Sequence, residues 1–214
     1  VRCPARKIHV IPLGVSPAFA PSGDDARTGE FRRRFNLADR ILLYVGSLKP
    51  HKNFSAVLRS LSDLRERKDL QVVCVGEKLE ENAPLKALCA DLGVGDRVRS
   101  LGWLPDADLI EAYRAATALL MPSFYEGFGF PVLEAMACGT PVVASNAASI
   151  PEVAGDAGIL FDPSAGGGLT DAVRAVLDDA GLRKSMRVKG LQRARQFTWE
   201  RCADATLKLY RTVG

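Results

Sequence analysis

"RILLYVGSLKPHKNFSAVLRSLSDLRERKDLQVVCVG", residues 40–76, decides the fold class of this chain. The stretch opens at 40–46 and closes at 70–76 with a largely apolar run that ends in glycine. Such runs are typical of strands that are buried on both faces. Residues 53–67 between them have the apolar spacing of an amphipathic helix. A strand, a helix and a second strand in this order predict a parallel βαβ unit.

The same alternation continues towards the C-terminus. Four more strands are predicted, at 97–104, 117–123, 140–145 and 158–162. The helices predicted among these strands lie at 83–94, 105–116, 131–139 and 149–156. We therefore expect an α/β fold, with a Rossmann-like, doubly wound parallel sheet of about six strands and helices on both faces.

Both ends of the chain depart from this alternation. Near the N-terminus, "KIHVIPLGV" at 7–15 predicts a short strand, and a loop rich in Pro, Gly and Asp is predicted over 16–30. A short charged helix is predicted to begin at Glu30. The last part of the chain predicts helices without strands, at 166–179, 181–197 and 198–213.

Composition limits the class of protein. Of the 214 residues, 47% are hydrophobic and 25% are charged, which is ordinary for a globular chain. The net charge of +4 is too small to indicate nucleic acid, so no nucleic-acid partner is expected. No apolar run reaches the 18 residues of a membrane span, and the first residues carry neither Met nor the apolar core of a signal peptide. We expect a cytoplasmic protein, and a fragment or processed product.

The five cysteines are scattered along the chain, at Cys3, Cys74, Cys89, Cys138 and Cys202. No C-x-x-C pair occurs, and the spacing of a metal site is absent. An odd number of cysteines without a framework fits a reducing compartment. We expect five free thiols and no metal.

The loop "GSLKPHKN" at 46–53 follows the first predicted strand of the alternation. The carboxyl ends of parallel strands share one edge of the sheet, and ligands bind at that edge. The helix that follows the loop offers free N–H groups and a partial positive charge. Lys49, His51 and Lys52 gather at the same helix end. Cations at a helix N-terminus are unfavourable for the helix dipole, so a bound polyanion such as phosphate would offset their charge. An ordinary surface turn with two lysines is the alternative.

A second loop at this edge, "PSFYEGFGF" at 122–130, carries the acidic residue Glu126. Its glycines allow a tight turn, and Pro131 then begins a helix that has Glu134 in its first turn. Two carboxylates beside a phosphate site suit the hydroxyl groups of a ribose or a sugar. The alternatives are that Glu134 compensates the helix dipole, and that Glu126 lies in water or braces the turn.

These motifs resemble a known family. The spacing E-x-x-x-x-x-x-x-E, from Glu126 to Glu134, is that of retaining glycosyltransferases of family 4, and the chain is similar to their carboxy-terminal, donor-binding domain, one half of a GT-B fold. The resemblance covers nearly the whole chain. It is carried, in order, by "VIPLGV" (10–15), "LYVGSLKPHKN" (43–53), "PSFYEGFGFPVLEAMACGTPVVAS" (122–145), "SIPEVAGDAGILFDP" (149–163) and "FTWERCA" (197–203).

The resemblance implies a role for each site residue. Glu134 would hold the ribose hydroxyls, Glu126 would face the donor sugar as the catalytic residue, and Lys52 would neutralise the diphosphate. Trp103 and Leu104 would frame the base. The other donor-binding positions that the resemblance implies, several of them through backbone atoms, are Gly46, Ser47, Lys49, Gly127, Phe128, Gly129, Phe130, Val132 and Leu133.

The resemblance also implies the donor and the partners. The donor would be a GDP-sugar or a UDP-sugar, with mannose favoured, and neither metal nor cofactor would be needed. Many members carry arginine where this chain has Ser47, which leaves the phosphate geometry open. The implied organisation is a linker from an absent N-terminal domain (1–36), the nucleotide-sugar domain (37–196) and a helix that crosses back (197–214). A glycan or lipid-linked acceptor would bind to the absent domain.

The tail is basic. Nine Lys and Arg residues lie between Arg183 and Arg211, against two acids, Glu200 and Asp204. Solvated helix faces are the simplest interpretation, and peripheral contact with the inner face of an anionic membrane is the alternative. Two other functions remain open, namely a nucleotide-sugar epimerase of the same architecture and a non-catalytic nucleotide-sugar-binding module.

Overall fold

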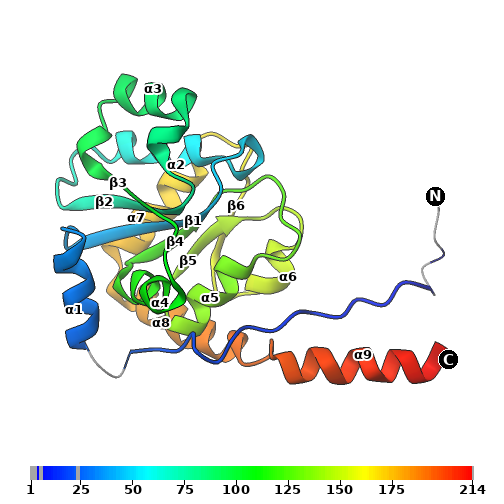
Figure 1. The fold of residues 1–214 in the computed structure, drawn as a ribbon. Coiled ribbons are helices and arrows are strands. Elements are labelled where there is room, and N and C mark those ends of the chain that lie inside the picture. The colour runs from blue at the N-terminus through cyan, green and yellow to red at the C-terminus, as the bar shows by residue number, and fades with distance from the viewer. Residues whose placement is uncertain (1–3, 5–6, 23–24, 214) are drawn as a thin grey trace.

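The computed structural model of the chain describes residues 4, 7–22 and 25–213, and a six-stranded sheet forms the centre of this part (Figure 1). Every strand pairs in parallel with its neighbour, which confirms the predicted doubly wound fold class. The spatial order is β3-β2-β1-β4-β5-β6. The strands are β1 (Arg40–Gly46), β2 (Leu70–Gly76), β3 (Val98–Gly102), β4 (Ala118–Met121), β5 (Val142–Ser145) and β6 (Ile159–Phe161).

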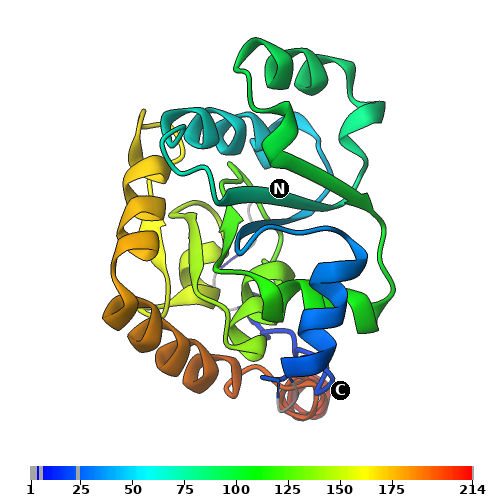
Figure 2. The ribbon, with the colours of Figure 1, turned by 90° about the vertical axis from the view of Figure 1, so that its left-hand side faces the viewer.

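Helices cover both faces of the sheet (Figures 1 and 2). The α-helices are α1 (Asp25–Arg34), α2 (Phe54–Asp63), α3 (Ala83–Asp91), α4 (Asp106–Ala115), α5 (Phe130–Cys138), α6 (Ile150–Ala154), α7 (Gly168–Asp178), α8 (Ala180–Ala194) and α9 (Trp199–Val213). Short 3-10 helices are η2 (Pro50–Lys52), η3 (Leu79–Glu81) and η4 (Gly95–Arg97). One hydrophobic core lies under α1, α4, α5 and α6, and the other lies under α2, α3 and α7.

The central strand β1 shows why its sequence is apolar without interruption. Ile41 and Leu43 point into the core under α4 and α5, whereas Leu42 and Tyr44 point into the core under α2. All four side chains are buried, at 2% exposure or less. A strand that is covered on both faces has no solvent side, so the alternation of polar and apolar residues disappears.

The predicted strand at 7–15 is wrong. Residues 8–15 have no regular secondary structure and belong to no ladder of the described sheet, and Val10 is 77% exposed. Pro12 has no N–H to donate to a ladder, and the apolar residues have no neighbouring strand to cover them. The segment meets the rest of the chain at its end, where Val15 N–H donates to the Phe197 carbonyl at 3.1 Å.

The predicted loop is also wrong over its last part, because α1 already begins at Asp25. Tertiary contacts stabilise this helix. Phe31 is buried in the core, Thr28 donates to the Glu111 carboxylate at 2.7 Å, and Arg34 pairs with Asp108 at 2.6 Å. The Asp and Gly content that suggests a loop therefore does not decide the structure of a segment that packs against α4.

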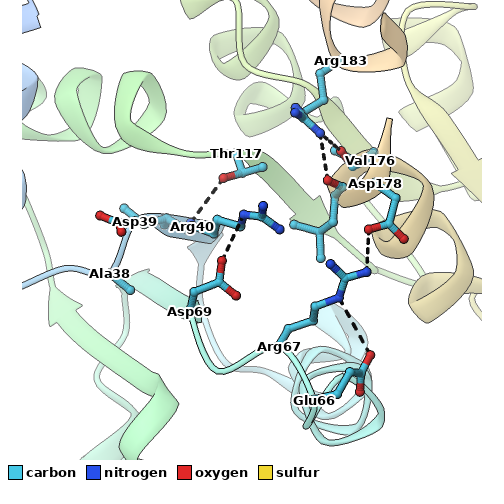
Figure 3. Close-up of polar contacts among 12 residues, drawn as sticks. Ala38, Asp39, Arg40, Glu66, Arg67, Asp69, Thr117, Val176, Asp178 and Arg183 are labelled. Carbon is cyan, nitrogen blue, oxygen red and sulfur yellow. Dashed lines mark hydrogen bonds and ion pairs between the residues drawn. The ribbon is translucent and has the colours of Figure 1, made fainter. Parts of the chain in front are cut away.

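The strand order reverses between β1 and β4, and ligands bind at such a switch point, beyond the carboxyl ends of the strands. The opposite, amino edge holds ion pairs (Figure 3). Arg40 pairs with Asp69 at 3.1 Å, and Arg67 pairs with Asp178 at 2.5 Å. These side chains are partly exposed, so each pair contributes only about 0–1 kcal/mol.

The last helix, α9, extends away from the sheet on the same side as the N-terminal segment (Figure 1). A Cβ on Gly14 would lie 2.2 Å from the backbone nitrogen of Trp199, so only glycine allows the segment to pass the start of α9. Leu207 and Tyr210 of α9 are 52% and 66% exposed. The helix is amphipathic, and its apolar side is left uncovered by the described residues.

Cys74, Cys89, Cys138 and Cys202 are free thiols, and Cys3 lies outside the described residues. Burial raises the pKa of Cys74 to about 12, which keeps this thiol protonated. A search of the described helices finds none with the length and apolarity needed to cross a bilayer.

Candidate functional site

The loops after β1 and β4 meet at the switch point. Phe124 N–H donates to the His51 carbonyl at 2.8 Å, and the Asn53 side chain donates to the Pro122 carbonyl at 3.2 Å. Asn53 has a left-handed backbone, with φ of 54°, where η2 passes into α2. These contacts hold the predicted phosphate loop against the loop that contains Glu126.

Lys52 and Glu126 form the centre of the site. The Lys52 Nζ lies 2.8 Å and 2.7 Å from the two carboxylate oxygens of Glu126. The Lys52 side chain is 22% exposed, and that of Glu126 is 8% exposed. The alternative that Glu126 lies in water is therefore wrong, because this carboxylate is buried and paired.

Serine hydroxyls fix Glu126 further. Ser123 Oγ donates to Glu126 Oε1 at 2.7 Å, and Ser149 Oγ donates to the Glu126 carbonyl at 3.0 Å. Ser145, at the end of β5, donates to the Ser123 carbonyl at 2.6 Å. Ser123 and Ser145 are 1% and 0% exposed. The position of Glu126 is thus set by residues that follow β4, end β5 and precede α6.

Glu134 lies on α5, but the prediction that it lies in the first turn is wrong, because the helix already begins at Phe130. A residue of α4 holds its carboxylate. The hydroxyl of Tyr113, a fully buried residue, donates to Glu134 Oε2 at 2.7 Å. Burial raises the pKa of Glu134, while this hydrogen bond acts in the opposite direction. Burial and the neighbouring Glu134 raise the pKa of Tyr113 well above its usual value, so this phenol stays protonated and donates.

The N-terminus of α5 closes the site. Gly129 is the N-cap residue with φ of 102°, a conformation that requires glycine, and it provides no side-chain cap. The amides of Val132 and Leu133 donate to the Gly129 carbonyl at 3.0 and 3.2 Å, and both side chains are buried in the core. Gly139 caps the other end of α5, as predicted.

The remaining predicted residues surround this centre. Ser47 accepts a hydrogen bond at its carbonyl from the Tyr44 hydroxyl at 2.6 Å, and Lys49 is exposed. Gly46 ends β1 beside Gly76 of β2, and a Cβ on Gly76 would lie 2.4 Å from the Gly46 oxygen. After β3, Trp103 is 77% exposed, whereas Leu104 is buried in the core.

Aromatic rings join the glycine turn to the start of α9. The ring of Phe128 lies 5.1 Å from that of Phe130 and 6.1 Å from that of Phe197. Phe130 stacks on Trp199 at 6.5 Å. A groove of about 730 Å³ opens beside Gly127, and its walls include Phe128, Glu152, Arg193 and residues 10–13.

Four site residues, Tyr113, Ser123, Ser145 and Ser149, are missed by the sequence reasoning. The hydroxyls of Tyr113, Ser123 and Ser145 lie inside predicted elements that are buried, and a buried hydroxyl needs a partner. The need for a hydrogen-bond partner could have marked these residues in the sequence. It could not have shown which residues are their partners. Within the described residues, no three His, Cys, Asp or Glu side chains are grouped as a metal would require, and the absence of a metal requirement stays a prediction.

A family model described as glycosyl transferases group 1 matches residues 27–193. The chain is 36% identical over 213 residues to O-antigen chain mannosyltransferase B of Escherichia coli, with 98% of this chain and 56% of that protein covered. It is 37% identical over 221 residues to D-inositol 3-phosphate glycosyltransferase of Salinispora tropica, with coverage of 95% and 46%. The chain therefore spans about half the length of the curated relatives it matches.

Among solved structures, the chain is similar to sucrose-phosphate synthase from Thermosynechococcus elongatus. The TM-score is 0.80 at 29% identity, with 96% of this chain and 52% of that chain covered. This similarity agrees with the observed parallel sheet and its two helical layers.

Proposed function

Because the chain belongs to the family of glycosyl transferases group 1, we propose that it is the nucleotide-sugar-binding half of a retaining glycosyltransferase. The full-length enzyme would transfer a hexose from a GDP-sugar or UDP-sugar to a glycan or lipid-linked acceptor. The observation that carries this proposal is the pairing of Lys52 with Glu126 at the switch point. It brings a cation for phosphate and a carboxylate for sugar hydroxyls into one site.

Each group would have one task in the transfer. Lys52 would leave Glu126 for the diphosphate and offset the charge of the leaving group. The freed carboxylate of Glu126 would then accept from the hydroxyls of the donor sugar. The uncapped N-terminus of α5 adds a partial positive charge for the phosphates. We propose that no cofactor is required, because these groups supply the positive charge.

A second domain would cover the apolar side of α9. Leu207 and Tyr210 are exposed there, and Val10 is exposed on the N-terminal segment. In this proposal residues 1–36 lead in from that domain, residues 37–196 bind the donor, and residues 197–214 return to it. The acceptor would bind to the second domain, with the reacting sugar between the two.

Mannose is the hexose that we favour, because the 36% identical relative is named as a mannosyltransferase. The name of that relative also suggests assembly of a surface polysaccharide. Such a reaction would place the enzyme in the cytoplasm, at the inner face of the membrane. The basic residues of α8 and α9 would suit an anionic lipid surface there.

We expect the chain to bind GDP or UDP, with affinity at least about 10-fold greater than for the matching nucleoside, because the diphosphate adds charge-assisted contacts. Isothermal titration with GDP, UDP, guanosine and uridine measures this and identifies the base. Equal affinity for nucleotide and nucleoside would contradict the phosphate site.

We further expect the 214-residue chain to transfer no sugar, while the full-length protein forms a glycosylated product. Product analysis of both proteins with radiolabelled donor tests the enzyme class. Isomerised donor without transfer would indicate the epimerase alternative. Nucleotide binding by the full-length protein without any reaction would indicate a non-catalytic module.

A further inference from the structure

Tyr113 reaches the candidate site from the interior of the protein. It lies on α4, which packs against α5 (Figure 1), and it is 0% exposed. The Thr140 hydroxyl donates to the Tyr113 carbonyl at 2.6 Å, and the ring of Phe19 meets that of Tyr113 edge-on at 6.0 Å. The phenol is therefore held by the core and has little freedom to follow a ligand.

The contact of this phenol with Glu134 is specific. The hydroxyl donates to Oε2 of the carboxylate at 2.7 Å. Within the described residues, no side chain or backbone group donates a hydrogen bond to Oε1. Glu134 itself is only partly buried, so its second oxygen can meet a ligand. A carboxylate that is fixed through one oxygen presents the other in a defined direction.

We propose that Tyr113 is a positioning residue for ribose recognition: its hydroxyl fixes Oε2 of Glu134, so that Oε1 accepts a hydrogen bond from the ribose diol of the donor. This inference rests on the proposed function, because it assumes that the ligand is a nucleotide. It assigns a role in binding to a residue that cannot touch the ligand. The competing explanation is that the buried hydrogen bond serves stability alone.

The electrostatic surroundings distinguish the two explanations. The titratable groups that act on Glu134 are Tyr113 and Asp106 of α4, and Cys138 lies further along α5. Arg187 of α8 meets α5 at its far end, beside Gly139. The hydrogen bond from Tyr113 favours the ionised carboxylate, so its loss should raise the pKa of Glu134. Ribose recognition needs the ionised carboxylate. As the pH is lowered, the variant would therefore lose its preference for ribose at a higher pH than the unsubstituted protein does.

The test compares a ribonucleoside diphosphate with its 2′,3′-dideoxy analogue, by titration of the full-length protein between about pH 5 and 8. The phosphates of the two ligands titrate alike, so the ratio of their affinities reports the ribose contact alone. Tyr113→Phe should reduce the preference for the ribonucleotide by about 10-fold at neutral pH. The pH at which half of the remaining preference for the ribonucleotide is lost, the pH midpoint, should be higher than in the unsubstituted protein.

Thr140→Val is the matched control. It removes a buried hydroxyl that bonds to the backbone of Tyr113 but not to Glu134. It should lower the melting temperature as Tyr113→Phe does, and leave the ribose preference and its pH midpoint unchanged. Glu134→Gln should abolish the pH dependence of the preference.

A second measurement avoids any loss of folding in the variant. Replacing the tyrosines of the full-length protein, four of which lie in this chain, by 3-fluorotyrosine makes each phenol a stronger hydrogen-bond donor, so the midpoint should move to lower pH. An unchanged ribose preference and midpoint in Tyr113→Phe would overturn the inference and leave the proposed function intact. Failure of the unsubstituted protein to bind nucleotide at all would overturn both.

Discussion

Replacing Glu126 by glutamine in the full-length protein should lower the turnover of sugar transfer by about 100-fold, the size of effect that follows the loss of one contact in the transition state. In the proposed transfer, the donor sugar would become oxocarbenium-like and gain positive charge as the diphosphate leaves. A carboxylate on its hydroxyls orients the ring and stabilises that charge. Steady-state kinetics at saturating donor and acceptor measure the effect.

The same substitution should not weaken binding of the free nucleoside diphosphate. In the structure Glu126 forms an ion pair with Lys52, and both of its carboxylate oxygens lie within 2.8 Å of the Lys52 Nζ. Glutamine removes the charge that competes with the phosphate, so the affinity should stay equal or increase. Titration calorimetry with the favoured diphosphate checks this. A clear decrease in nucleotide affinity would instead favour the role in which Glu126 braces the glycine turn.

Glu111→Gln is the matched control for a general effect of losing a buried glutamate. Glu111 is 4% exposed, pairs with Arg114 at 2.7 Å, and accepts from Thr28, but it lies on α4 away from the two loops. Its replacement should lower the melting temperature without changing turnover. If Glu126→Gln lost activity only in proportion to its own melting temperature, the catalytic role would be wrong.

The fold was predictable because the signals for it are local. β1 and β2 follow the apolar runs 40–46 and 70–76 residue for residue, and the glycines that end them lie at the sheet edge of the candidate site. The segment 8–15 misled the prediction because a strand also needs a neighbour to pair with, and no local pattern supplies one. The start of α1 was missed because contacts with α4 stabilise it.

The site was predictable in its residues but not in its connections. Lys52 and Glu126 are recognisable from their loops, but their mutual pairing follows from the reversal of strand order between β1 and β4. That order depends on contacts over long separations in the chain. The roles of Ser123 and Tyr113 were hidden for the same reason, since a buried hydroxyl shows its partner only once the elements are packed.

Replacing Lys52 by methionine should have two separable effects. The affinity for nucleoside diphosphate should fall about 10-fold or more, because the proposed charge-assisted contact with the phosphates would be lost. The free energy of unfolding should also fall by about 3 kcal/mol, the low end of the cost of breaking a buried ion pair, since the Lys52 side chain keeps 22% exposure. Titration calorimetry and urea denaturation measure the two effects.

A double variant separates these effects. Glu126 at 8% exposure would be left as a buried carboxylate without its cation, so adding Glu126→Gln to Lys52→Met should recover most of the lost stability. It should not recover the nucleotide affinity, because the lysine charge is still missing. Lys49→Met in the same loop should leave stability unchanged, since Lys49 is exposed and outside the ion pairs of the described residues. If nucleoside and nucleoside diphosphate lost affinity equally in Lys52→Met, the lysine would act on the fold and not on the phosphates.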